Sequence, residues 1–356
     1  MNSSSHATPR KGRGAQLNPP NQFLSQRFER SEWEAIDLPE SEEWPTQVFK
    51  ERGKTILNKV KSPDIPLPYS MNPYQGCEHG CVYCYARNTH PYYGFSAGLD
   101  FESKIMVKEN AAELLEEAFD KKSWKPQAVM FSGNTDCYQP LERKLELTRK
   151  CLEVFVKYRH PVGMITKNSL ILRDIDLLQD LAKDNLVHVT ITITTLNEEL
   201  RRKLEPRTVP GKRRVEVIRK LSEAGIPVGL SLSPVIPGLN QHEIPDIVKA
   251  AADAGACSAF YIVLRLNGEI GGIFENWLEH HYPDRKEKVL HQVRELHGGK
   301  LEDNRFGKRM RGEGPVAEAI RGLFYLARNK YMPESGFPAL NLAAFKRPDK
   351  GQLSLF

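Results

Sequence analysis

Three cysteines lie close together in the first quarter of the chain, and their spacing is the most specific chemical signal in the sequence. The segment reads NPYQGCEHGCVYCYAR, which places Cys77, Cys81 and Cys84 in a C-x3-C-x2-C pattern. Three thiolates are one short of the four ligands that fill a 4Fe–4S cluster, so one iron would stay open to a small ligand. Gly76 and Gly80 would let the backbone wrap closely around such a core. The pattern therefore predicts an iron–sulfur site suited to catalysis.

A structural zinc site is the alternative interpretation of the same segment. Zinc is often held by three cysteines and one histidine, and His79 or His90 could be the fourth ligand. Zinc sites usually divide their ligands into two separated pairs, whereas these three cysteines share one loop. The remaining cysteines, Cys137, Cys151 and Cys257, are scattered. Scattered cysteines fit a reducing cytoplasm better than a disulfide framework.

The composition is that of a soluble protein. Hydrophobic residues make up 40% and charged residues 27% of the 356 residues, and no run approaches the ~20 apolar residues that span a bilayer. The first residues contain no apolar segment of the kind found in a secretory signal. The net charge of +6 permits binding to a polyanion without establishing it. We therefore expect a cytoplasmic protein with no membrane contact.

The elements that must position the cysteines alternate between strand and helix. Apolar β-rich runs predict strands at 69–75, 127–132, 161–166, 186–195, 226–233 and 258–264. Amphipathic stretches between them predict helices at 111–120, 143–158, 174–182, 213–224 and 243–254. Several of the strands are apolar on both faces, as expected of a parallel sheet covered by helices. Six such units predict part of a parallel barrel, with reactive groups on the loops after the strands.

The chain outside this core differs in composition. Residues 1–30 are polar and proline-containing with a basic run, which predicts a disordered basic arm. An N-terminal extension at 31–66 precedes a core at 67–265. A mostly helical C-terminal extension follows at 266–346, with helices at 285–296 and 315–329, and a flexible tail occupies 347–356. The predicted fold class is therefore α/β, a partial barrel with these additions.

The cysteine pattern, with an aromatic residue before the third cysteine, resembles the signature of the radical SAM superfamily. In that family the open iron binds S-adenosylmethionine (SAM), and one electron from the cluster cleaves it to methionine and a 5′-deoxyadenosyl radical. The resemblance implies a partial (β/α)6 TIM-like barrel and an electron donor such as flavodoxin or ferredoxin. Further motifs resemble the spore photoproduct lyase-like branch, often labelled DNA repair photolyase-like: NPYQGC, SGNTDCYQPLE, TKN, EPR and PVIPGLN.

The resemblance also implies roles for individual residues. The three cysteines match the cluster ligands. Tyr83 and Tyr85 match positions that pack against the adenine and ribose of SAM. Thr135 and Asp136, after the second strand, match polar groups near the methionine end of SAM. Lys167, after the third strand, matches a lysine that meets the SAM carboxylate.

The later strands contribute less specific matches, and one position departs from the lyase. Thr192 or Thr194, and Ser233, match contacts to the ribose or methionyl part, although strand threonines are commonly only β-formers. Where the lyase has a cysteine that returns hydrogen to the product radical, this sequence has Asn134. Cys137, three residues further on, could be the hydrogen donor or an inert core residue. The resemblance thus supports SAM cleavage more strongly than repair of a thymine dimer.

Basic residues gather in two places besides the arm. The first group is Arg201, Arg202, Lys203, Arg207, Lys212, Arg213, Arg214, Arg219 and Lys220, and the second is Arg305, Lys308, Arg309 and Arg311. Such groups could follow a phosphate backbone, which makes nucleic acid a possible partner. A solvated helix face is the commoner explanation for a charge run of this kind.

The last five residues, Gln352, Leu353, Ser354, Leu355 and Phe356, resemble the pentapeptide by which bacterial repair and replication proteins bind the DNA sliding clamp. An apolar cluster on a tail needs a partner pocket, unless the tail folds back onto its own domain. We therefore expect a clamp-bound radical SAM enzyme that acts on a base in DNA. Two alternatives are a radical SAM enzyme acting on RNA or protein, and a clamp-tethered iron–sulfur protein that binds DNA or senses redox state without turnover.

Overall fold

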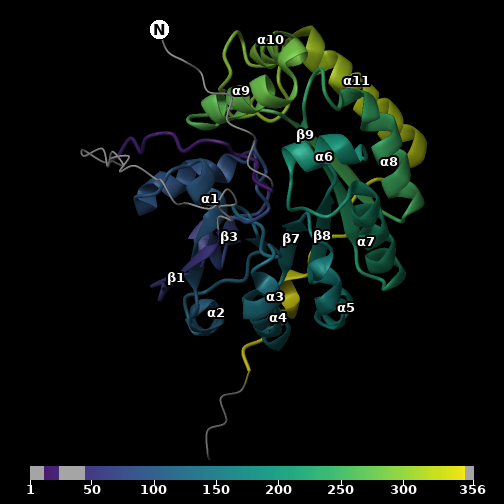
Figure 1. Ribbon diagram of the computed structural model, residues 1–356. Coiled ribbons are helices and arrows are strands. Elements are labelled where there is room, and N and C mark those ends of the chain that lie inside the picture. Colours follow the sequence, from purple (N-terminus) through teal and green to yellow (C-terminus); the bar gives the residue numbers. More distant parts are fainter. Residues whose placement is uncertain (1–11, 24–44, 349–356) are drawn as a thin grey trace, which may run out of the picture.

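A parallel sheet forms the centre of the computed structural model, which describes residues 12–23 and 45–348 (Figure 1). Six parallel strands are neighbours in chain order. They are β3 (Tyr69–Met71), β6 (Val129–Phe131), β7 (Val162–Thr166), β8 (Val187–Thr192), β9 (Val228–Val235) and β10 (Ser258–Val263). The short β2 (Asn58–Lys59) pairs antiparallel with β3 at one edge. The predicted partial (β/α)6 barrel is confirmed.

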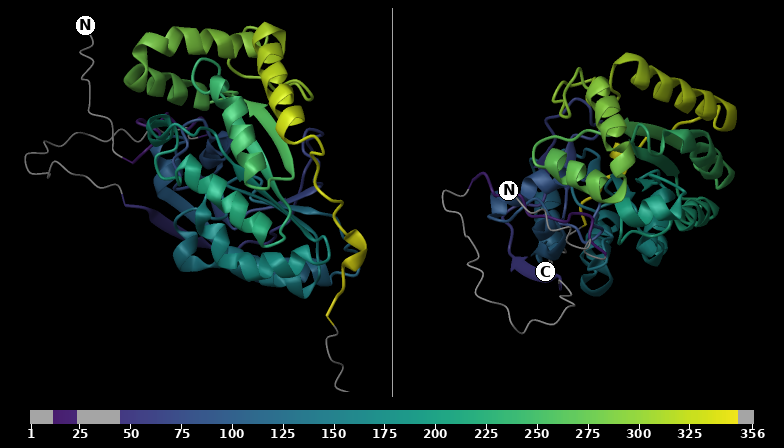
Figure 2. Two further views of the ribbon diagram at one scale, coloured as in Figure 1. Left: turned by 90° about the vertical axis from the view of Figure 1, so that its right-hand side faces the viewer. Right: turned by 45° about the horizontal axis from the view of Figure 1, so that its top comes forward.

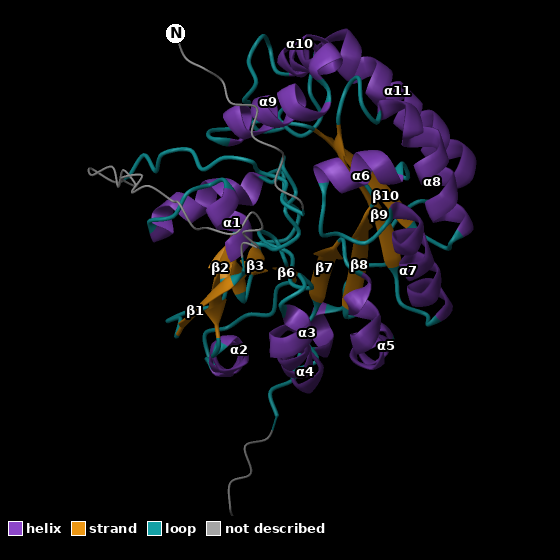
Figure 3. Ribbon diagram, in the orientation of Figure 1, coloured by secondary structure: helices purple, strands orange, loops and turns teal. Residues whose placement is uncertain are grey.

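Helices cover the outer face of the sheet because each carries an apolar side toward it (Figure 3). These helices are α2 (Ala111–Asp120), α4 (Leu147–Lys157), α5 (Ile175–Ala182), α7 (Gly211–Glu223) and α8 (Ile244–Asp253). Gly225 and Gly255, at φ of 75° and 93°, follow α7 and α8 in the left-handed conformation that the sequence predicts. The predicted helix at 143–158 is divided into α3 (Glu142–Leu145) and α4, because Glu146 adopts a φ of 53°.

The first predicted strand, at 69–75, is also divided. Pro73, which has no N–H to donate to a sheet, separates β3 from β4 (Tyr74–Gln75). β4 joins a small second sheet in the order β1-β5-β4, where β1 is Gln47–Glu51 and β5 is Lys104–Lys108. The chain therefore changes sheets just before the first cysteine, and the cysteine loop lies at the junction.

The C-terminal extension is helical and lies at one end of the molecule (Figure 2). It comprises α9 (Ile270–His281), which the sequence analysis did not predict, α10 (Lys286–Leu296) and α11 (Gly314–Tyr331). α9 contacts the 3-10 helix η1 (Tyr85–Tyr93) that follows the cysteines, and α11 packs on α8. After α11 the chain returns along the sheet, where Lys346 N–H donates to the Tyr158 carbonyl. None of the described helices is long and apolar enough to cross a membrane.

Short elements complete the described chain. They are α1 (Leu99–Ser103), α6 (Glu198–Leu204), and the 3-10 helices η2 (Ser169–Asp174), η3 (Gln241–Glu243), η4 (Pro283–Arg285) and η5 (Leu342–Ala344). α1 and α6 matter most for the site because they lie beside the cysteine loop. α1 precedes β5, and α6 follows β8 at the carboxyl edge of the sheet (Figure 1).

Residues 12–23 pack against the body of the protein, although the sequence predicts a disordered arm there. The Gly14 and Ala15 N–H groups donate to the Glu102 carboxylate at 3.1 and 2.7 Å. A Cβ on Gly14 would lie 1.7 Å from the Gly80 carbonyl oxygen, so only glycine permits this approach. The rest of the predicted arm lies outside the described residues.

Candidate active site

The cysteine loop follows β4 and returns sharply on itself. Gly76 and Gly80 take φ of 83° and 67°, the left-handed conformation that glycine adopts most easily. Cys77 and Cys81 are buried and Cys84 is half-buried, and all three are free thiols. Burial raises the pKa of each thiol above its usual value. A bound cation would reverse this preference, because metal coordination stabilises the thiolate.

A buried carboxylate, Glu102 of α1, holds one side of the loop. Arg87 donates to it at 2.5 Å and also to the Cys81 carbonyl, and both side chains are 0% exposed. The N–H groups of Gly14 and Ala15 satisfy the same carboxylate from the N-terminal segment. Each charge and donor in this group has a partner, which is what burial of an ion pair requires.

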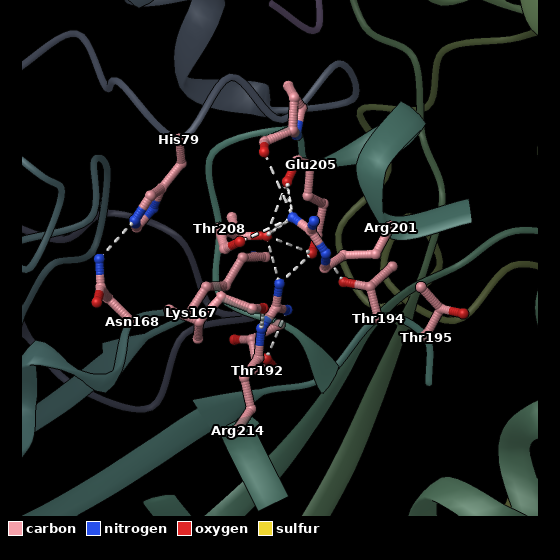
Figure 4. Close-up of polar contacts among 12 residues, drawn as sticks. His79, Lys167, Asn168, Thr192, Thr194, Thr195, Arg201, Glu205, Thr208 and Arg214 are labelled. Atoms are coloured by element: carbon pink, nitrogen blue, oxygen red, sulfur yellow. Dashed lines mark hydrogen bonds and ion pairs between the residues drawn. The ribbon is translucent and has the colours of Figure 1, made fainter. Parts of the chain in front are cut away.

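A second buried carboxylate, Glu205, directly follows α6 and also contacts the loop (Figure 4). It accepts hydrogen bonds from Tyr83 of the cysteine loop and from Thr194, and it pairs with Arg214 of α7. Burial alone would raise the pKa of Glu205, but the positive charges of Arg214 and Lys167 and these hydrogen bonds lower it to about 2. The carboxylate therefore stays ionised and fixes the Tyr83 ring beside the cysteines.

Asp136 connects two strand ends to the loop. It accepts hydrogen bonds from the Thr166 hydroxyl at 2.7 Å and the Lys167 N–H at 2.9 Å, and its carboxylate lies 3.3 Å from His79 Nδ1. Burial would raise the pKa of Asp136, but His79 and these donors lower it to about 2. The other ring nitrogen of His79 meets the Asn168 amide (Figure 4). Both ring nitrogens of His79 therefore already have partners within the protein. This argues against His79 as a zinc ligand.

The cysteine loop carries the three thiols that a 4Fe–4S cluster requires. Within residues 12–23 and 45–348, no three Cys, His, Asp or Glu side chains converge as they would around one metal ion. A cubane cluster spreads its three cysteine ligands over three iron atoms, so those thiolates stay further apart than around a single ion. The three thiols do share one loop, and the Cys77 pKa is raised by Cys81 and Cys84 as well as by burial. These residues fit a 4Fe–4S cluster.

Lys167 is a cation close to this loop. Its ammonium lies 5.9 Å from the centre of the Tyr83 ring, and its charge acts on Cys81, Cys84 and Glu205. No hydrogen bond or ion pair of the ammonium is formed with any residue in the described ranges. The arrangement suits an external anion beside the cysteines.

The other residues predicted to contact SAM lie at the same edge of the sheet. They differ in the hydrogen bonds that they already form within the protein. The Thr135 hydroxyl donates to the Tyr74 carbonyl at 2.6 Å, and Thr194 is occupied by Glu205. Thr192 is buried, with its carbonyl accepting from Arg214, and the Ser233 hydroxyl lies 2.6 Å from that of Ser231. The structure thus places these positions at one edge, and the hydroxyls of Thr135, Thr194 and Ser233 already form hydrogen bonds within the protein.

Tyr85 and Cys137 lie on different sides of the site. Tyr85 is about half exposed and its hydroxyl donates to the Gly133 carbonyl. Cys137 belongs to the main apolar core behind the sheet, and burial raises the pKa of its thiol well above the usual value. The structure does not bring Cys137 into the apolar clusters that contain the three loop cysteines, so its role as hydrogen donor stays a prediction. The predicted clamp-binding residues 352–356 lie outside the described residues.

The basic residues singled out in the sequence are largely paired within the protein. In the first group Arg201 and Arg202 pair with Glu198, Lys203 with Glu199, Arg214 with Glu205 and Arg219 with Glu216. In the second, Arg305 and Lys308 pair with Glu313 and Arg309 with Asp64. Among the described residues, Lys212, Arg213 and Lys220 of the first group form no ion pair, whereas most of the other basic residues are neutralised by neighbouring carboxylates.

The sequence analysis did not assign a role to Glu205, Arg214, Glu102 or Arg87. One signal was present, because Glu205 begins the EPR motif that resembles the lyase branch. Glu205 meets Tyr83 across 122 positions of sequence, and no local pattern predicts that contact.

Comparison with known proteins agrees with the site. The family model described as "Radical SAM superfamily" matches residues 71–251. An uncharacterised protein of Mycobacterium tuberculosis is 31% identical over 247 residues, covering 68% of this chain and 72% of that protein. An uncharacterised protein of Methanocaldococcus jannaschii is 29% identical over 247 residues, covering 69% and 88%.

Two further comparisons concern proteins with a stated activity. A solved structure of spore photoproduct lyase has a TM-score of 0.60 to this chain at 15% identity, covering 81% of this chain and 80% of the other. That likeness shows a shared fold. The radical SAM Nα-GlyT isomerase of Pseudomonas phage M6 is 28% identical over 172 residues, which are 48% of this chain and 34% of the isomerase. Because the family model covers half of the chain, including the cysteine loop and the barrel strands β6 to β9, this chain belongs to the radical SAM superfamily and is a radical SAM enzyme.

Proposed function

We propose that this enzyme abstracts hydrogen from a nucleic-acid base, in the context of DNA repair or modification. The observation that carries the proposal is the meeting of the cysteine loop, the unpaired Lys167 and the buried Glu205 network at the carboxyl edge of the barrel strands. In parallel barrels, reactive groups lie on that edge. The proposal that the substrate is a nucleic-acid base rests on the similar proteins and on the resemblance of the C-terminal tail to a clamp-binding motif.

Different residues would bind the cluster and SAM. Cys77, Cys81 and Cys84 would bind a 4Fe–4S cluster. When bound, the cluster and SAM supply a carbon radical able to abstract hydrogen from an unactivated position. Lys167 would bind the SAM carboxylate through its free ammonium. Glu205 would keep the Tyr83 ring in place beside the cofactor, since its hydrogen bond to the phenol fixes the ring.

Support for a nucleic-acid substrate comes from two independent directions. The fold matches that of a lyase solved in complex with dinucleoside spore photoproduct, at a TM-score of 0.59. The tail Gln352–Phe356 resembles the sliding-clamp pentapeptide, which would bring the enzyme to DNA. Asn134 occupies the place of the lyase's hydrogen-donating cysteine. We therefore propose a reaction on a base other than the reversal of a thymine dimer.

Deuterium transfer tests this function. Reduced, cluster-loaded enzyme would be mixed with SAM and oligonucleotides carrying deuterated bases, and deoxyadenosine would be analysed by mass spectrometry. We expect deuterium in deoxyadenosine with at least one DNA substrate and none with the Cys77→Ala variant. Deoxyadenosine formed with deuterium only from RNA or protein would place the substrate outside DNA. Failure of the reduced enzyme to form deoxyadenosine with any substrate would instead favour an iron–sulfur protein without turnover.

A further inference from the structure

A small cavity lies between the two ends of the partial barrel. It has a volume of about 200 Å³ and is lined by Tyr85, Asn88, Arg265, Asn267, Ile270, Asn304 and Arg309. Tyr85 directly follows the third cysteine, and Arg265 follows β10, the last strand. The cavity therefore lies between the segment that follows the cysteine loop and the segment that follows the last barrel strand. It is smaller than the roughly 300–1,000 Å³ that encloses a whole drug-sized ligand, so it suits one chemical group of a larger molecule.

The lining favours an anion. It contains two guanidinium groups and no carboxylate. Arg309 is neutralised by Asp64, to which its Nε donates at 2.5 Å. Arg265 is half-buried, and within the described parts of the chain its guanidinium forms no hydrogen bond or ion pair. The carboxylates of Asp64 and Asp303 lie near enough to act on this charge but form no ion pair with it, so its five donors are open to water or to a ligand.

The neighbouring polar groups are already fixed in place. Asn88 donates to the Asn267 carbonyl at 2.9 Å, and Asn267 donates to the Asn304 side-chain oxygen at 2.7 Å. This leaves the Asn304 amide nitrogen as a donor beside Arg265. An amide donor next to a planar guanidinium is a suitable combination for the oxygens of a phosphate.

Aromatic rings flank the cavity. Tyr85 is 49% exposed and Phe306 is 57% exposed, with the Arg309 guanidinium 4.4 Å from the centre of the Phe306 ring. Phosphate-binding cations alternating with exposed aromatic rings are typical of sites for unpaired nucleic-acid strands. Enzymes that react with a base remove it from the stack, so an unpaired base is the form that could reach the site.

We propose that Arg265, with Asn304, binds a backbone phosphate of an unpaired nucleic-acid segment and so places the adjoining base beside Tyr85, and therefore beside the SAM that the resemblance places against the same residue. This inference rests on the proposed nucleic-acid substrate and specifies where its backbone is held. It assigns to Arg265 a role distinct from that of Lys167. Lys167 serves the cofactor, and Arg265 serves the substrate.

Fluorescence anisotropy with a short single-stranded oligodeoxynucleotide tests the proposal without any turnover. We expect Arg265→Gln to weaken binding about tenfold at low salt, because one charge-assisted contact is lost. The slope of log affinity against log salt should fall by about 0.7, the value for one phosphate on a single strand. Arg265→Lys keeps the charge and should retain part of the affinity. The control Arg219→Gln removes a half-exposed guanidinium from α7 and should change neither quantity.

Several outcomes would overturn the proposal. Equal affinity and salt slope for Arg265→Gln and the unchanged protein would remove Arg265 from the substrate site. Thymidine monophosphate binding as tightly as the oligonucleotide would rule out a strand-specific contact, and so would tight binding of a phosphopeptide in place of DNA. Weakened SAM binding by Arg265→Gln, with oligonucleotide binding intact, would assign the cavity to the cofactor. Because anisotropy needs no SAM cleavage, its result is independent of the deuterium experiment, and either can fail while the other succeeds.

Discussion

Two arginines near the cysteine loop have opposite environments. Arg214 is fully buried, pairs with Glu205, and donates its remaining N–H groups to the Val209 and Thr192 carbonyls and the Thr208 hydroxyl. Arg265 is half-buried and forms no hydrogen bond or ion pair in the described ranges, and the walls of its cavity contain no carboxylate. The first arrangement is complete without a ligand and stabilises the fold. The second is open to solvent, so its donors are available to a ligand.

Lys167 and Arg87 repeat the contrast on the other side of the loop. Arg87 is satisfied by Glu102 and by the Cys81, Ala97 and Gly98 carbonyls, whereas the Lys167 ammonium has only an aromatic ring nearby. The cysteine loop is therefore held by completed ion pairs and has cations without ion pairs nearby. Changes in the completed ion pairs should affect stability, and changes in Lys167 or Arg265 should act mainly on ligand binding.

The largest expected effect is loss of the cluster. Anaerobic reconstitution should give about four iron and four sulfide per chain, and Cys77→Ala, Cys81→Ala or Cys84→Ala should each abolish iron binding. Iron content and visible absorption measure this. Cys257→Ala is the matched control, because this half-buried cysteine lies at the start of β10 away from the loop. Stoichiometric zinc without iron, after anaerobic purification from iron-replete cells, would contradict the cluster.

The next largest effect concerns the buried ion pair of Glu205 and Arg214. Glu205→Gln leaves Arg214 as a buried charge without a counterion, which should lower the free energy of unfolding by about 3–5 kcal/mol. Urea denaturation of the protein before reconstitution measures the change. Glu199→Gln, which removes a fully exposed carboxylate paired with Lys203, should leave the unfolding curve unchanged. Equal curves for the two variants would mean that the Glu205 network does not stabilise the loop.

The sequence predicted the barrel because its signals are local. Alternation of apolar runs with amphipathic stretches, ended by Gly225 and Gly255, follows from side chains that are neighbours in the chain. The cysteine spacing is local for the same reason. These patterns located the six parallel strands and the site edge without any knowledge of long-range contacts.

Contacts between distant segments were not predictable in this way. The N-terminal residues 12–23 have the composition of a disordered arm, yet Ala15 is fully buried because Glu102, 87 positions later, accepts its N–H. The basic residues at 201–220 resembled a phosphate-binding surface, because the sequence does not show which carboxylates form ion pairs with them. The structure supplies carboxylates for most of them, and it leaves unpaired Arg265, a residue that stood in neither basic group.

A smaller effect, confined to ligand affinity, is expected for Lys167→Ala. Removing the ammonium should weaken SAM binding on the order of tenfold or more, since a charge-assisted contact contributes about 1.5–3 kcal/mol. Iron content should not change, and the unfolding curve should shift much less than for Glu205→Gln, because the ammonium acts on Glu205 through its charge but forms no hydrogen bond or ion pair in the described ranges. Equilibrium dialysis with labelled SAM measures the affinity. Lys183→Ala, an exposed lysine paired with Asp180, is the control, and equal SAM affinity for both variants would exclude Lys167 from the cofactor site.

The smallest effect on the folded protein is expected from deleting Gln352–Phe356. We propose that Leu355 and Phe356 fill an apolar pocket of the bacterial sliding clamp while Gln352 hydrogen-bonds at its edge. A five-residue segment buries little area and must be ordered on binding, so we expect micromolar affinity, about −8 kcal/mol or weaker.

Clamp encirclement of DNA would then supply the effective concentration that a single phosphate contact at Arg265 cannot. Calorimetry with purified clamp should show binding of the intact protein and of Ser354→Ala, whose changed position the pentapeptide pattern leaves unspecified, and none of a chain ending at Gly351. SAM cleavage should be the same in all three proteins, because the barrel is unchanged. Equal clamp affinity with and without the last five residues would show that the tail does not bind the clamp. Arg265, which forms no ion pair in the described ranges, would then be the feature of this chain that points most directly to nucleic acid.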